Sequence, residues 1–185
     1  MSDPQSQQDI VEQITAIQHG LSNDIERITD ARFCTGTAES WSASDYLKHL
    51  LLSVKPVAKA MSFPAEVLER QFGRSERASK SYAEVLQAYK KRLEEGIRVE
   101  DFDKVVPVFY RFPEGTTDER AYLVQSWNEA NQRLIDATQK WSEADLDHLQ
   151  IPHPAVGMLT LREMLFFTLF HNMLHWHDIQ HAGGL

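Results

Sequence analysis

Apolar residues recur at steps of three and four along three long segments of the chain, a spacing that places side chains on one face of an α-helix. These segments are residues 9–30, 47–61 and 122–135. In the first, the apolar positions are separated by glutamine, glutamate, asparagine and aspartate. We expect this stripe to lie in the core; its members are Ile10, Ile14, Ile17, Leu21, Ile25 and Ile28.

The end of the chain follows a different pattern, because apolar residues occupy nearly every face of residues 160–182. A helix that is apolar all round is packed centrally among other helices. Thr160 with Glu163 forms a capping box at its start, and Gly183-Gly184 is the expected stop. A similar box, Ser42 with Asp45, marks the start of the second long helix.

The segment between the second and third long helices is less regular. Residues 62–81 predict a connection with one short helical turn, residues 81–96 a short helix, and residues 97–115 irregular structure. The third long helix should begin near Thr116 or Thr117. A loop with two prolines and a glycine is expected at residues 150–157, before the last helix.

Four long helices without a repeat or a clear strand pattern predict an all-α four-helix bundle. The bundle would carry an extra short helix and an irregular insertion between its second and third long helices. With 185 residues, the chain has the usual length of one domain, so residues 1–185 are expected to form a single bundle. Its 42% apolar and 25% charged residues exclude a disordered or fibrous protein.

Charge and cysteine content narrow the function further. A net charge of −8 argues against nucleic-acid binding, which needs clustered lysine and arginine. The lone cysteine, Cys34, excludes an intramolecular disulfide and is expected to be buried without a role. The N-terminus lacks a signal-peptide pattern, and no apolar run reaches the roughly 20 residues of a membrane span. We therefore expect a cytoplasmic protein that does not bind membranes.

The last helix carries the clearest chemical signal, His171 and His175 at positions i and i+4. These imidazoles lie one turn apart on the same face, close enough to share one metal ion. The competing interpretation is a hydrogen-bonded histidine pair packed among aromatic residues. His177 and His181 have the same spacing but are rotated by roughly 200° from the first pair, so only one pair can face a given site.

A catalytic zinc-like ion usually has three protein ligands and one open position, so a third ligand is needed. His49, His148 and His153 are the candidates, and periodicity does not choose among them. Zincin peptidase chemistry is disfavoured because Asn172 stands where that motif has a glutamate. The zinc deaminase motif needs two cysteines and is excluded.

Three separated motifs together resemble the DinB-like (DinB/YfiT-like) superfamily of four-helix bundles over essentially the whole chain, although residues 62–115 are longer and less typical. The resemblance implies a divalent metal ion bound by His49, His171 and His175, with zinc or nickel the first choices, although imidazole also suits copper and iron. The motifs are Trp41 with His49, then Ile151-Pro152-His153-Pro154 with Gly157 and Leu159-Thr160, then His171 with His175.

Neighbouring residues receive weaker assignments. Asp178 lies on the face of His171 and His175, one turn further on, so it either orients an imidazole or is a surface aspartate near a helix end. Tyr46, Phe167 or Trp176 could line a pocket. His153 is expected to have a structural role.

The characterised enzymes that the chain resembles are metal-dependent thiol transferases and isomerases that use bacillithiol, mycothiol or glutathione. The resemblance therefore implies a thiol S-transferase or hydrolase acting on a small molecule, with no catalytic residue yet assigned. The alternative is a non-catalytic, stress-associated or structural bundle in which metal serves stability or is absent. We also expect a homodimer, the commonest soluble oligomer.

Overall fold

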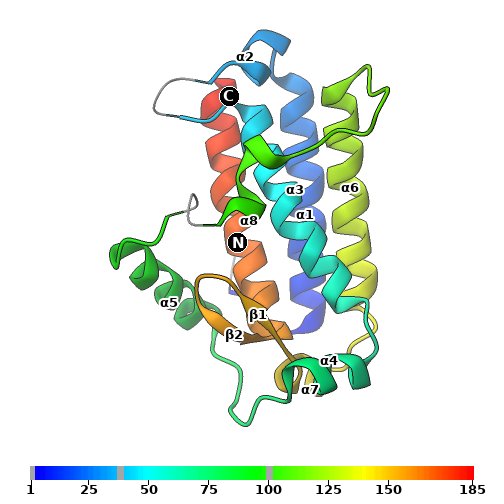
Figure 1. Cartoon of the computed structure of the whole chain (residues 1–185), viewed down its shortest axis with the longest axis vertical. Coiled ribbons are helices and arrows are strands. Elements are labelled where there is room, and N and C mark those ends of the chain that lie inside the picture. Colours follow the sequence, from blue (N-terminus) through cyan, green and yellow to red (C-terminus); the bar gives the residue numbers. More distant parts are fainter. Residues whose placement is uncertain (1–2, 37–39, 99–101) are drawn as a thin grey trace.

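The four apolar segments form the four long helices of an all-α bundle (Figure 1). The computed structural model describes residues 3–36, 40–98 and 102–185. Helices α1 and α3 each pack against both α6 and α8. The long helices are α1 (Gln7–Arg27), α3 (Ala43–Met61), α6 (Glu119–Thr138) and α8 (Leu161–Gly183).

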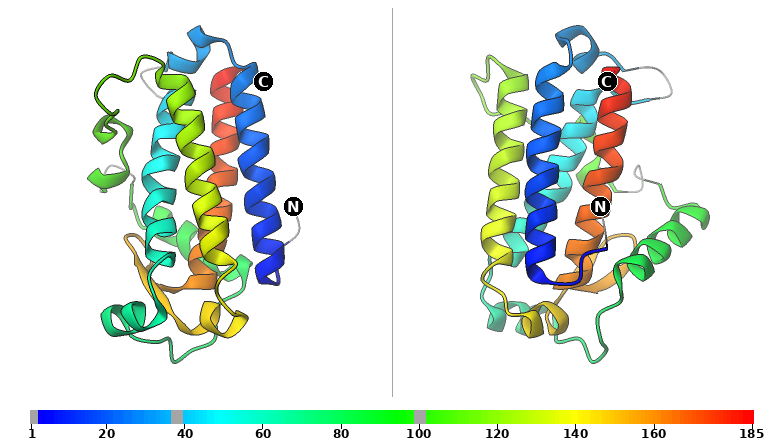
Figure 2. Two further views of the ribbon diagram at one scale, coloured as in Figure 1. Left: turned by 90° about the vertical axis from the view of Figure 1, so that its right-hand side faces the viewer. Right: turned by 180° about the vertical axis from the view of Figure 1, so that it is seen from behind.

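The directions of the helices explain the insertion. Helices α1 and α8 run one way along the bundle and α3 and α6 the other (Figures 1 and 2). Because α3 and α6 are parallel neighbours, the chain must return along the bundle between them. Residues 62–118 connect these two helices, and the described parts of this range contain α4 (Ala65–Phe72), α5 (Tyr82–Glu94) and the 3₁₀ turns η2 (Asp103–Val105) and η3 (Pro107–Phe109).

The predicted core is confirmed. All six members of the first stripe are buried, none more than 2% exposed. Helix α8 is buried at every residue from Leu161 to Leu169, and it contacts α1, α3, α5 and both short strands, as expected of a central helix. The capping boxes at Ser42 and Thr160 are both formed, and Gly184 ends α8 in the left-handed conformation.

Two helix boundaries and the exposure of one residue differ from prediction. Helix α1 ends at Arg27, because Thr29 caps a separate short helix, α2 (Asp30–Cys34). Helix α6 begins at Glu119, since Asp118 accepts a hydrogen bond from the amide of Ala121 and acts as the N-cap. Cys34, expected in the core, is exposed.

Residues 62–81 contain more helix than predicted. Pro64 precedes an eight-residue helix, α4, and Gly73 ends it at a φ of 73°. Leu68 is its one buried residue and is fully inaccessible. A single anchoring leucine produces no recognisable periodicity, which is why the sequence pattern missed this helix.

The loop predicted at residues 150–157 is an antiparallel hairpin of β1 (Gln150–His153) and β2 (Gly157–Thr160). Ile151 pairs with Leu159 and both are buried, whereas Pro152 pairs with Met158 and both are exposed. Four residues per strand are too few for this alternation to stand out in the sequence. The hairpin packs on α4 and α8 and leads directly into α8.

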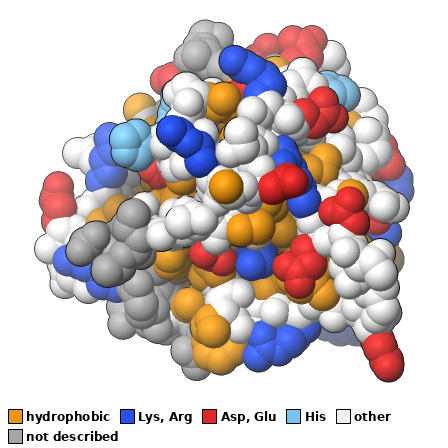
Figure 3. Space-filling view, turned by 90° about the horizontal axis from the view of Figure 1, so that it is seen from above, with side chains coloured by type: hydrophobic (Ala, Val, Ile, Leu, Met, Phe, Trp, Pro, Cys, Tyr) orange, Lys and Arg blue, Asp and Glu red, His pale blue; other side chains and the backbone are white. Residues whose placement is uncertain are grey.

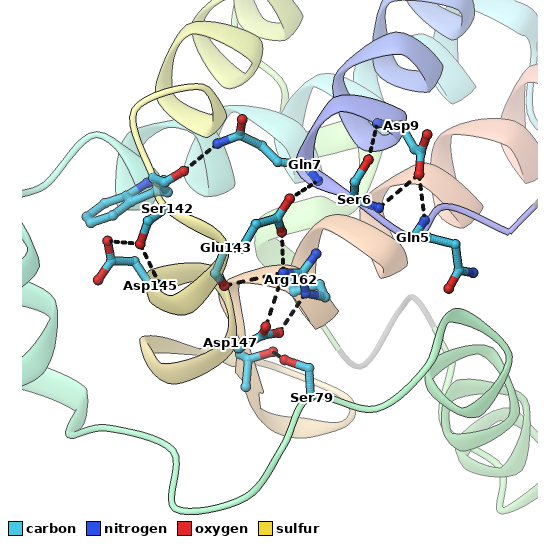
Figure 4. Close-up of polar contacts among 12 residues, drawn as sticks. Gln5, Ser6, Gln7, Asp9, Ser79, Ser142, Glu143, Asp145, Asp147 and Arg162 are labelled. Atoms are coloured by element: carbon cyan, nitrogen blue, oxygen red, sulfur yellow. Dashed lines mark hydrogen bonds and ion pairs between the residues drawn. The ribbon is translucent and has the colours of Figure 1, made fainter.

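Ion pairs fix the N-terminal end of α8 (Figure 4). The Arg162 guanidinium binds Glu143 at 2.5 Å and Asp147 at 2.6 Å, both from α7 (Glu143–His148). Glu143 also accepts a hydrogen bond from the amide of Gln7 at the start of α1. These contacts join α1, α7 and α8, and so hold the helix that carries two of the histidines.

The surface gives no sign of one dominant charge at the upper end of the bundle. Figure 3 shows acidic and basic side chains interspersed there among apolar ones. Across the described ranges, no helix combines the length and apolar character needed to cross a membrane.

Candidate metal centre

Three histidines meet where α3 and α8 pack together. His49 comes from α3, and His171 and His175 come from successive turns of α8. One ring nitrogen from each lies within 4.8 Å of the other two. In the described part of the chain, this is the one group of three or more histidine, cysteine or acidic residues with the spacing of a metal site.

The orientation of His49 is set by the insertion. Its Nδ1 lies 2.7 Å from the backbone oxygen of Val105 in η2. A carbonyl oxygen only accepts, so Nδ1 must carry the proton and Nε2 keeps its lone pair. Nε2 lies 2.9 Å from Nε2 of His171, which directs that lone pair at the centre of the cluster.

His175 has a comparable hydrogen bond. Its Nδ1 lies 2.8 Å from Oδ2 of Asp178, one turn further along α8. A carboxylate that accepts this hydrogen fixes the ring orientation and makes the other nitrogen a stronger donor to a metal. The placement matches the orienting alternative predicted for Asp178, and an effect on metal binding stays a prediction.

Burial keeps two of the histidines neutral. Desolvation lowers the pKa of His49 to about 4, against an opposing effect of its hydrogen bond to Val105, and the charge of His175 lowers it further. The pKa of His171 falls well below its usual value, chiefly through burial and then through the charges of His175, His49 and His153. Neutral imidazole is the form that binds metal, so both rings are ready to act as ligands near neutral pH.

The geometry fits a divalent ion. Zinc–imidazole bonds of about 2.1 Å place neighbouring ligand nitrogens roughly 3.3 Å apart around a tetrahedral ion. The 2.9 Å separation of the His49 and His171 nitrogens needs only a small side-chain adjustment, whereas the widest pair, within 4.8 Å, must close by up to about 1.5 Å. Because His49 Nε2 lacks a proton, His171 Nε2 donates the hydrogen between them, and an ion would replace that proton.

Aromatic rings surround the cluster. Tyr46 stacks on His175 with ring centroids 5.5 Å apart, and Phe167 stacks on His171 at 5.4 Å. Trp41 lies 5.3 Å from His49. Tyr46 and Phe167 thus contact the cluster as the pocket prediction requires, and Trp41, which belongs to the family motif that includes His49, is an additional wall residue.

Trp176 does not line this pocket. Its indole nitrogen donates to Asp24 of α1 at 2.9 Å, and its ring covers Gly20, also in α1. Trp176 follows His175 by one residue, which is a rotation of about 100° around the helix axis. Its side chain therefore points towards α1 and not towards His49 on α3.

The other histidines are separated from the cluster, with one exception. His148, His177 and His181 are exposed, so the second pair on α8 faces away from the buried site. His153 in the hairpin lies beside Phe167, with ring centroids 4.1 Å apart.

The Val105 carbonyl that orients His49 could not have been identified from the sequence, because every residue type carries the same backbone oxygen.

Replacing Asp178 tests the second hydrogen bond. We expect Asp178→Ala to weaken metal binding about tenfold or more, because outer partners of metal-bound histidines typically contribute 10-fold to 100-fold. Asp178→Asn keeps an uncharged acceptor oxygen, so its metal affinity should lie between those of wild type and Asp178→Ala. Competition with a chromogenic chelator measures the Kd, and Asp136→Ala on exposed α6 surface is the control. Unchanged affinity in Asp178→Ala would show that this carboxylate does not support the site.

Comparison with known protein families gives a match over most of the chain. A family model described as the DinB superfamily matches residues 13–179, which include all three histidines. No curated protein matches the chain.

Proposed function

The chain belongs to the DinB superfamily, and from this membership and the three-histidine cluster we propose that it is a metal-dependent enzyme, either a thiol S-transferase or a hydrolase. The observation that carries the proposal is the convergence of three ring nitrogens within 4.8 Å, two of them on buried neutral imidazoles. Zinc or nickel is the ion we propose.

The donor set determines the chemistry. Three neutral imidazoles leave the full charge of a divalent ion uncompensated, and such an ion lowers the pKa of a water or thiol enough to supply a nucleophile near neutral pH. His49 and His171 are buried, whereas the His175 side chain is 16% exposed. A small substrate would therefore approach on the His175 side, past Tyr46.

The protein contributes position and a low-polarity environment. Val105 and Asp178 hold the rings of His49 and His175, so these ligands need little reordering when a substrate arrives. Trp41, Tyr46 and Phe167 offer apolar surface to the carbon skeleton of a substrate. The proposed partners are a small electrophile and a low-molecular-weight thiol, with the protein acting as a homodimer.

The test is consumption of a thiol by metal-loaded protein. Glutathione, bacillithiol and mycothiol are each mixed with a small aromatic or epoxide electrophile, and free thiol is followed with time. We expect zinc- or nickel-loaded wild type to accelerate the loss, and the chelator-treated protein and a His175→Ala variant to fail. A parallel assay with activated esters tests the hydrolase alternative.

The second candidate is a non-catalytic bundle in which the ion serves stability. The burial of His49 and His171 between two long helices favours it, because an ion there would tie α3 to α8. A ligand that binds only the folded state stabilises it by mass action. Raised thermal stability on metal loading, without thiol or ester turnover by any substrate tested, would support this alternative.

A further inference from the structure

His153 lies beside the candidate metal centre without taking part in it. Its ring contacts Phe167, which in turn stacks on His171. Tyr89 from α5 approaches both rings edge-on, with centroids 6.4 Å from His153 and 4.9 Å from Phe167. His153 is thus one aromatic ring away from the three-histidine cluster, at the junction of the hairpin, α5 and α8.

The hairpin turn determines which ring nitrogen of His153 carries the proton. Backbone amides of Ala155 and Val156 donate to its Nδ1 at 3.1 and 3.3 Å. A nitrogen that accepts two hydrogens carries none, so the ring proton must be on Nε2. Burial lowers the pKa of His153 to about 4, which agrees with a neutral ring.

The Nε2–H group is therefore an oriented donor. The two ring nitrogens point in widely different directions, so Nε2–H is directed away from the turn that Nδ1 holds. No group in the described ranges accepts a hydrogen bond from it. The His153 side chain is only partly buried, so water can accept this hydrogen bond until a guest supplies an oxygen acceptor in its place.

We propose that His153 is a specificity-determining residue whose Nε2–H binds a carboxylate or carbonyl oxygen of the substrate while its reacting atom lies at the three-histidine cluster. This inference rests on the proposed function and narrows the substrate class to molecules with an oxygen acceptor a short distance from the reacting thiol or electrophilic carbon. It assigns binding, not proton transfer, to His153.

Two substitutions of His153 test separately its hydrogen bonds to the turn and its free N–H donor. Asparagine matches His153 near Nδ1, because its side-chain oxygen accepts amides two and three residues on, as in Asx turns, but it lacks the distal donor. Glutamine places an amide N–H near the position of Nε2 and loses the acceptor for the turn. His148→Asn, at an exposed histidine, is the matched control.

Binding of two thiols to cobalt-loaded protein is the measurement, followed by thiolate-to-cobalt absorption. The thiols are 3-mercaptopropionate, which carries a carboxylate, and propanethiol, which does not. We expect His153→Asn to keep its metal content, thermal stability and propanethiol affinity, but to bind 3-mercaptopropionate about tenfold more weakly, the effect of one hydrogen bond to a charged acceptor. His153→Gln should keep the preference for 3-mercaptopropionate and unfold at lower temperature.

The outcomes distinguish the two proposals. If His153→Asn binds both thiols like wild type, or His153→Gln loses as much preference as His153→Asn, the assignment of His153 is overturned while the metal site stands. If wild type takes up no cobalt, or gives no thiolate absorption with either thiol, the proposed function fails and this inference fails with it.

Discussion

A His171→Ala variant is expected to lose the near-stoichiometric metal that the wild-type protein should carry after purification without chelator. His171 is the central member of the cluster, since its Nε2 lies 2.9 Å from that of His49 and its ring centroid 4.6 Å from that of His175. Two remaining imidazoles are fewer than the three protein ligands that zinc sites normally have. Elemental analysis of both untagged proteins gives the metal content directly.

Loss of the fold must be separated from loss of a ligand. His171 is 5% exposed, so alanine leaves a cavity between α3 and α8 as well as removing a nitrogen. His175→Ala provides a second test at a partly exposed site, where truncation disturbs packing less. Circular dichroism and thermal melts of each variant, in chelator, show whether the bundle survives.

The same helix supplies the control. A His177→Ala, His181→Ala double variant removes a histidine pair with the same i, i+4 spacing from the exposed side of α8. It should retain full metal content. Folded wild type that stays metal-free after zinc and nickel are added back would contradict both the ligand assignment and the enzyme proposal.

The sequence allowed prediction of those parts of the fold that arise from local periodicity. The stripe from Ile10 to Ile28 and the box of Thr160 with Glu163 depend on residues within a few turns, and both are found in the structure. Helix α4 and the hairpin depend on single buried contacts such as Leu68 and the Ile151–Leu159 pair. Such contacts are tertiary, so their sequence patterns are too short to recognise.

The candidate site likewise has a local part that the sequence reveals and a tertiary part that it does not. The pair His171 and His175 is local and was visible in the sequence, but periodicity left His49, His148 and His153 equal as third partners. The resemblance to the DinB-like family selected His49, and the packing of α3 on α8 places it beside the pair. That these three histidines bind metal stays a prediction. The turn that orients His153 was hidden, because it depends on the hairpin fold.

The metal-free protein should lose stability steeply as pH falls from about 6.5 towards 4. His49 and His153 each have a pKa of about 4 in the fold against an ordinary histidine value of 6.5, and the pKa of His171 is also strongly lowered. Between these values the unfolded chain binds protons that the folded protein excludes. The free energy of unfolding therefore falls with falling pH, by about 1.4 kcal/mol per pH unit for each such histidine.

Acidic groups add to this loss only at lower pH. The pKa of buried Glu163 is lowered, with desolvation opposed by Arg77 and by the amides of Lys80 and Thr160. Glu163 stabilises the fold at pH values above its unfolded pKa, near 4.5. This stabilisation is lost as the pH falls through its pKa in the folded protein. Stability changes between pH 6.5 and 5 therefore report the histidines.

Urea unfolding at pH 7, 6 and 5, with chelator present, measures this dependence. Two or three excluded protons would lower the free energy of unfolding by several kcal/mol over the range, a large share of the 5–15 kcal/mol typical of domains. His153→Asn should reduce the pH dependence of the free energy of unfolding by about one proton. A flat profile from pH 7 to 5 would mean that the buried imidazoles take up protons without unfolding, and that the cluster is more accessible to solvent than its burial implies.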